Sequence, residues 1–139
     1  MNTKFSNTFI SKGFIIAGLS NILGVLIFSK LFTNPAIEIF NPQVMSNFGL
    51  VMIMLWGFVY ITISKSFNTV KWLVFILAIE KFVYAINWSY WFTNNKISQV
   101  FEKDTLAGIF YVIYGLNDWL FFFFFLLVFF KINNVSKNN

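Results

Sequence analysis

Residues 106–130 read LAGIFYVIYGLNDWLFFFFFLLVFF, an apolar run in which Asp118 is the only charged side chain. A helix of about 25 residues is long enough to cross the roughly 30 Å hydrocarbon core of a bilayer, because each residue adds about 1.5 Å. A lone strand in lipid would leave its backbone groups without hydrogen bonds. The run therefore predicts a transmembrane helix.

Three further apolar segments have a similar length. They cover about residues 13–32, 45–63 and 70–92. Hydrophobic residues make up 58% of the 139-residue chain and charged residues 11%, against about 45–50% and 25% in soluble domains. The sequence thus predicts an all-α fold, an integral membrane four-helix bundle with up-down-up-down topology, in which residues 1–139 form a single transmembrane domain. The tight connection at 65–69 predicts that the second and third spans are antiparallel neighbours.

The distribution of lysine predicts the orientation of these spans. All ten cationic side chains are lysines, and the formal net charge is +5. The N-terminal arm, the second connection and the C-terminal tail carry Lys4, Lys12, Lys65, Lys71, Lys131 and Lys137, whereas the other connections carry Lys30, Lys96 and Lys103. Because short cytoplasmic loops are enriched in lysine, both termini are expected in the cytoplasm.

Missing residue types exclude several classes of function. The chain contains no histidine, cysteine or arginine. Haem and zinc sites normally use His or Cys ligands, so we expect no cofactor and no metal. Catalytic dyads and triads that use His or Cys are excluded as well. The lysines form no basic stripe, so no nucleic-acid partner is expected.

Three ionisable residues fall near the middle of predicted spans. Glu80 and Lys81 lie in the third span and Asp118 in the fourth. Each charge at this depth costs roughly 2.5–3.5 kcal/mol, so these side chains should face the protein interior and pair or become neutral. A Lys81–Asp118 contact is one arrangement, and a proton shared by Glu80 and Asp118 is the other. Either could support function or only fix the register of the helices.

Helical spacing groups other polar and aromatic residues with these charges. Glu80, Tyr84 and Asn87 share a face of the third span with Trp91, and Tyr111, Tyr114 and Asp118 share a face of the fourth. The first span has a stripe of small residues at positions 13, 17, 20 and 24, which permits close helix approach. The run Phe121–Phe125 is expected to contact lipid. The candidate ligand-binding or ion-pair residues are Glu80, Lys81, Asp118, Asn117, Asn87, Tyr84, Tyr114, Tyr111, Asn21 and Trp56.

The layout resembles the small four-span bacterial inner-membrane proteins grouped around the DoxX-like families. The resemblance rests on FGLVM at 48–52 continuing to Tyr60, on Glu80-Lys81, and on YGLND at 114–118. It implies a protein of the bacterial inner membrane, in some cases an accessory subunit of a membrane redox system. No catalytic residue is carried over, and the missing His and Cys argue against direct electron transfer here.

Three functions compete on these observations. The first is a membrane protein whose central polar pocket binds a lipid or quinone, or docks a membrane partner or a second copy of the chain. The second is an oligomeric proton-coupled transporter, with Glu80 exchanging a proton for a cation. The small multidrug exporters have a similar size, but they carry their essential acid in the first span, which has none here. The third is an intramembrane lipid isomerase with Glu80 and Asp118 as acid and base. The chain offers no complete catalytic set, so a non-enzymatic role is favoured.

Overall fold

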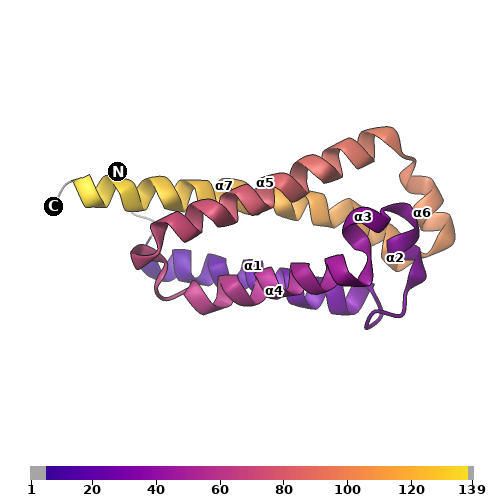
Figure 1. The fold of residues 1–139 in the computed structure, drawn as a ribbon, viewed down its shortest axis with the longest axis horizontal. Helices are drawn as coiled ribbons and strands as arrows, with labels where there is room; N and C mark the ends of the chain where they lie inside the picture. The colour runs from indigo at the N-terminus through magenta and orange to yellow at the C-terminus, as the bar shows by residue number, and fades with distance from the viewer. Residues whose placement is uncertain (1–5, 138–139) are drawn as a thin grey trace.

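The structure, a computed structural model, describes residues 6–137, and all the regular secondary structure in that range is helical, which confirms the all-α prediction. The elements in chain order are α1 (Asn7–Phe28), α2 (Pro35–Phe40), α3 (Pro42–Met45), α4 (Asn47–Ile63), the 3₁₀ helix η1 (Phe67–Thr69), α5 (Lys71–Asn94), α6 (Ile97–Lys103) and α7 (Thr105–Lys137). The longer helices α1, α4, α5 and α7 run side by side (Figure 1). We call the end that carries η1 the terminal end and the end that carries α2, α3 and α6 the loop end.

Three helices are long and apolar enough to cross a membrane, namely α1, α5 and the Thr105–Ile132 part of α7. Helix α4 is apolar but shorter, with 17 residues. The predicted first span begins too late, because α1 already starts at Asn7, where Ser6 accepts a hydrogen bond from the Phe9 backbone N–H. One lysine of the orientation prediction, Lys4, lies outside the described residues.

Segments expected to be irregular contain short helices. Proline occupies the first position of both α2 and α3, where its fixed φ and missing N–H suit a helix start. The Asn34 side chain accepts a hydrogen bond from the Ala36 N–H and so caps α2. Residues 6–137 therefore hold seven α-helices, where the sequence predicted only the long ones.

The long helices pack as two pairs, α1 with α4 and α5 with α7. Gly18 and Gly57 lie at the first seam, and a Cβ added to Gly18 would lie 2.5 Å from the Gly57 carbonyl oxygen. The expected stripe of small residues is therefore wrong at Gly24, which has open space beside it. The connection at 65–69 does join α4 to α5 tightly, but those two helices are not among the extensively packed pairs.

Aromatic side chains fill the core near the terminal end. Phe14 stacks on Phe67 at 5.6 Å between ring centroids and contacts Phe125 at 5.0 Å. The expectation that residues 121–125 only contact lipid is wrong for Phe121 and Phe125, which are buried in this core. A helix returns to the same face after about four residues, so these two point inward while the residues between them turn away.

The outer surface of the molecule is apolar and its interior holds charge. Large exposed apolar side chains occur along every long helix, for example Ile16 on α1, Leu55 on α4, Val83 on α5 and Leu120 on α7. Glu80, Lys81 and Asp118 are buried instead. A soluble protein has the opposite arrangement, since charged residues are almost never fully buried there.

Candidate functional site

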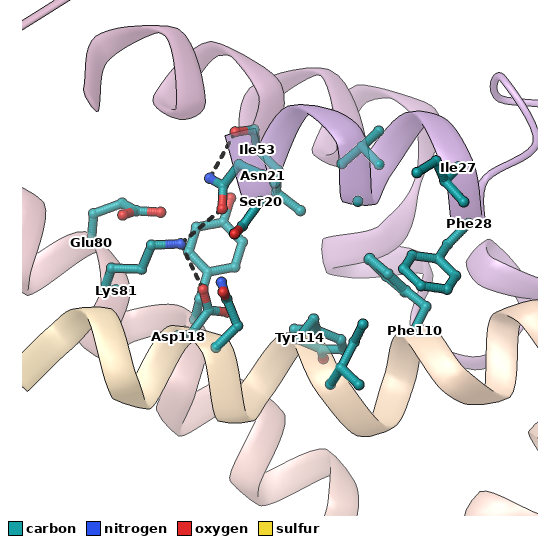
Figure 2. Close-up of a pocket in the computed structure, with 15 residues that line it drawn as sticks. Ser20, Asn21, Ile27, Phe28, Ile53, Glu80, Lys81, Phe110, Tyr114 and Asp118 are labelled. Atoms are coloured by element: carbon teal, nitrogen blue, oxygen red, sulfur yellow. Dashed lines mark hydrogen bonds and ion pairs between the residues drawn. The ribbon is translucent and has the colours of Figure 1, made fainter. Parts of the chain in front are cut away.

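A buried ion pair lies at mid-length of the helices. The Lys81 Nζ is 2.7 Å from Asp118 Oδ1, and the Lys81 residue is only 1% exposed. The same ammonium donates to Asn21 Oδ1 at 3.1 Å, and the Asn21 amide donates to the Ile53 carbonyl at 3.0 Å (Figure 2). One chain of hydrogen bonds thereby connects α1, α4, α5 and α7. This confirms the Lys81–Asp118 alternative of the sequence analysis.

Glu80 faces a different neighbour. The Tyr60 hydroxyl of α4 donates a hydrogen bond to Glu80 Oε2. The Lys81 ammonium lies 5.3 Å from the centroid of the Tyr60 ring, which places a cation over an aromatic face. Consecutive residues on a helix project about 100° apart. Glu80 and Lys81 therefore reach different partners, and Asp118 accepts a hydrogen bond from Lys81 instead of sharing a proton with Glu80.

A cavity of about 320 Å³ adjoins these charges, at the lower end of the roughly 300–1,000 Å³ typical of ligand pockets. It is lined by Ser20, Asn21, Gly24, Val25, Ile27, Phe28, Ile53, Glu80, Lys81, Tyr84, Phe110, Ile113, Tyr114, Asn117 and Asp118. Figure 2 shows its two-sided character: the charged groups gather on one side, and Phe28, Phe110 and Tyr114 gather toward the loop end. The cavity therefore offers one polar and one aromatic region.

The cavity opens between α1 and α7. Ile27 on α1 is 57% exposed and Ile113 on α7 is 42% exposed, yet both line the cavity. A Cβ added to Gly24 would meet no atom within 4 Å. The mouth thus lies on the apolar side of the helices rather than at either end.

Several polar groups at the cavity have hydrogen-bonding capacity to spare. Within residues 6–137, the side chains of Ser20, Tyr84 and Asn117 line the cavity without forming a hydrogen bond. The Tyr114 hydroxyl is buried and also lacks a partner there, although the Asn41 side chain lies near it without good hydrogen-bond geometry. Buried polar groups usually find partners, so this spare capacity is typical of a site that receives a polar ligand.

The predicted site residues divide into two groups. Those at the cavity are Glu80, Lys81, Asp118, Asn117, Tyr84, Tyr114 and Asn21. Asn87, Tyr111 and Trp56 lie elsewhere: Asn87 accepts a hydrogen bond from Asn41 at 3.2 Å, Tyr111 donates to the Ile37 carbonyl at 2.6 Å, and Trp56 packs against the aromatic core. These three side chains join elements together and do not line the cavity.

Among the residues that the sequence analysis did not single out for the site, Tyr60, Phe28 and Phe110 define its character. Tyr60 donates a hydrogen bond to Glu80, a contact that helical spacing alone did not predict. Phe28 and Phe110 supply the aromatic region, with ring centroids 5.7 Å apart. The position of an aromatic residue within an apolar run does not distinguish a cavity wall from a lipid contact. Only the inward spacing of Phe110 with Tyr114, four residues apart, carried a signal.

A second polar cluster holds the loop end. Lys30 and Asp104 form an ion pair of 2.6 Å, and the Asn34 amide donates to the other oxygen of Asp104 at 2.9 Å. The Ala107 backbone N–H also donates to Asp104, which therefore caps α7. The hydrogen bond from Lys30 is the main reason that the pKa of Asp104 falls to about 2. We call Lys30, Asn34 and Asp104 the loop-end clasp, because they join the end of α1 to the start of α7.

Comparison with protein-family models, with characterised proteins and with solved structures found no match to the chain. Within the described residues, His, Cys, Asp and Glu form no group of three that could hold a metal ion. The arrangement can pair charges, donate and accept hydrogen bonds, and enclose a small molecule beside aromatic rings.

Proposed function

We propose that the chain is a four-span protein of the bacterial inner membrane, with up-down-up-down topology and both termini in the cytoplasm. Helix α4 has 17 residues, which is at the short end of the range for a membrane span. Its exposed face is as apolar as those of the other long helices, with Phe48, Leu55 and Phe58 outward. A molecule whose exposed surface is apolar on every long helix is stable when lipid surrounds it and not when water does.

The lysine pattern and the fold support the orientation. The connection at η1 lies at the same end as the start of α1 and the end of α7 (Figure 1). Lys12, Lys65 and Lys71 belong to that end, which matches the excess of lysine expected on the cytoplasmic side. The bacterial placement rests on the DoxX-like resemblance. Because the chain has no cysteine, single cysteines introduced at either end and labelled with an impermeant maleimide test the orientation.

The function that the cavity supports best is binding of an amphiphilic membrane molecule with one polar end, such as a lipid-like compound or a quinone. One observation carries this: a polar cluster at mid-length borders a cavity whose mouth opens sideways between Ile27 and Ile113. A ligand could enter from the hydrocarbon phase, place its polar end beside the charged cluster and leave its apolar part near Phe28 and Phe110.

Other occupants receive less support from the same geometry. A helix from a membrane partner or a second copy is about 10–12 Å across, too wide for a cavity of about 320 Å³. The isomerase hypothesis needs Glu80 and Asp118 to act on one substrate as acid and base, but Asp118 already accepts a hydrogen bond from Lys81. Binding requires neither a second helix nor a free Asp118.

A substitution that fills the cavity tests the proposal. In Gly24→Phe the new ring has open space to occupy and should block the ligand without displacing the backbone. Leu23→Phe is the matched control, because Leu23 lies on the same helix but is exposed. Native mass spectrometry after mild detergent extraction should show a bound small molecule on wild type and on Leu23→Phe, and should show its loss from Gly24→Phe. An unchanged bound mass on Gly24→Phe would overturn the proposal.

A further inference from the structure

The charges around the cavity do not balance. Two acids, Glu80 and Asp118, accompany one base, Lys81. Lys81 forms an ion pair with Asp118, 2.7 Å away, and also donates a hydrogen bond to Asn21. Glu80 has only a neutral phenol, Tyr60, as its hydrogen-bond partner among the described residues. Because a buried charge is costly unless it is paired, the site must hold one additional positive charge, as a proton or as a bound cation.

We infer that the ligand of this cavity is a cationic amphiphile, a protonated amine with an apolar body, and that its binding displaces a proton from Glu80. The inference rests on the proposed function and names the chemical class that the same cavity takes. The ammonium would pair with the Glu80 carboxylate, and the apolar body would extend toward Phe28 and Phe110.

The cavity provides room and partners for such a group. Glu80 lines the cavity. Its Oε2 accepts a hydrogen bond from the Tyr60 hydroxyl, whereas its Oε1 accepts no hydrogen bond within residues 6–137. Tyr84, one turn further along α5, lines the same cavity. An ammonium beside aromatic rings gains cation–π attraction, and this gain increases when water is excluded.

The charged and titratable groups that surround Glu80 come from three helices. Helix α4 contributes Tyr60, α5 contributes Lys81 and Tyr84, and α7 contributes Asp118. Helix α1 contributes Ser20 and Asn21, which do not titrate. Lys81 and Asp118 are locked to one another, so Glu80 is the acid left to exchange its proton. In that exchange the carboxyl loses a proton to the bulk, and the ammonium takes its place as the positive charge.

A matched set of probes tests the class of ligand. We would use 4-butylbenzylamine, its trimethylammonium analogue and the neutral 4-butylbenzyl alcohol, titrated by calorimetry into the protein in nanodiscs, with empty nanodiscs subtracted. At about pH 8 the amine and the trimethylammonium analogue should bind roughly tenfold more tightly than the alcohol, because a charged partner for Glu80 is stronger than a neutral one. Binding of both cations should weaken at about pH 6, since protons compete for Glu80. The binding heats should vary with the ionisation enthalpy of the buffer, as proton release requires.

Variants separate this inference from the proposed function. Glu80→Gln should lower the affinity for both cations to that for the alcohol, whereas Glu80→Asp should keep the preference for cations. Glu102→Gln changes an exposed acid and should leave the affinity for every probe unchanged. Because Glu80→Asp keeps the carboxylate, retained cation binding in this variant would show that the loss in Glu80→Gln comes from the missing charge and not from a folding defect. Equal affinity of amine and alcohol for wild type, lost in Gly24→Phe, would overturn the cationic class and leave the proposed function intact. No binding of any probe, together with no ligand by native mass spectrometry, would overturn both.

Discussion

The two halves of the helix bundle are held together in different ways. Toward the terminal end, aromatic rings fill the space between α1, α4, α5 and α7, with Phe14, Tyr60 and Phe125 fully buried. Toward the loop end, a second buried cluster that includes Trp91, Phe110 and Tyr111 is supplemented by hydrogen bonds from side chains to backbone carbonyls. Tyr111 donates to Ile37, and Trp91 donates to the Phe40 carbonyl at 2.8 Å.

This difference explains where the cavity lies. In a bilayer the lipid tails are as apolar as the helix surfaces, so helices associate through close packing and hydrogen bonds. The terminal half is filled by the aromatic core around Phe14 and Phe125. In the loop half, the loop-end clasp joins α1 to α7 at one end, and the Lys81–Asp118 pair lies at mid-length of the helices. Between these two contacts the side chains of α1 and α7 leave the cavity open. A cavity can persist there without the helices collapsing onto it.

The largest effect should come from breaking the charged layer between the two halves. Lys81→Met leaves Asp118 buried without a partner, so we expect the free energy of unfolding to fall by about 3–5 kcal/mol. Replacing both partners, Lys81→Met with Asp118→Leu, should recover most of that loss, because no uncompensated charge remains. Unfolding in mixed micelles, followed by circular dichroism, measures both variants. If the double variant were as unstable as the single one, the pair would not act as a unit.

An intermediate effect should distinguish packing in the two halves. Phe125→Ala removes a ring that contacts Phe14 at 5.0 Å and Tyr60 at 5.1 Å, and should cost roughly 3 kcal/mol by leaving an enclosed void. Phe110→Ala removes the same atoms beside an existing cavity that lipid chains can enter, so about 1 kcal/mol is expected. The same unfolding measurement compares them. Equal losses would show that Phe110 is as closely packed as Phe125 despite the cavity beside it.

Much of the fold could be predicted from the sequence because it depends on apolar run length. The spans at 70–92 and 106–130 match α5 and α7 closely, and burial of Glu80, Lys81 and Asp118 followed from the cost of charge in lipid. The Lys81–Asp118 pair was one of the two arrangements that the sequence allowed, because both residues lie at mid-length of antiparallel helices.

Helix rotation and neighbour choice could not be predicted in the same way. The close approach at Gly18 and Gly57 depends on which face of α1 meets α4, and the predicted stripe of small residues did not include Gly18 and was wrong at Gly24. The partnership of Tyr60 with Glu80 also depends on rotation about two helix axes. The short helices α2, α3 and α6 follow from local proline and capping chemistry that apolar run length does not report.

The smallest effect should come from the loop-end clasp, and it should depend on pH. The pKa of Asp104 is lowered to about 2, mainly by the hydrogen bond from Lys30. A lowered pKa in the folded state stabilises the fold above the ordinary value of about 4, and this contribution is lost as pH falls from about 4 to about 2. Lys30 is half exposed and its charge is screened by water, so we expect only about 1 kcal/mol.

Asp104→Asn should therefore lower the free energy of unfolding by about 1 kcal/mol at neutral pH and make no difference near pH 2. Its matched control is Glu102→Gln, two residues away and exposed, which should change stability little at either pH. High salt should reduce the effect of Asp104→Asn, since the pair is near the surface. A loss in Asp104→Asn that stayed constant down to pH 2 would show that Asp104 acts through its cap on Ala107 and not through its charge. The ion pair with Lys30 would then add nothing to the loop half, and the polar contribution there would come from neutral hydrogen bonds such as that of Tyr111.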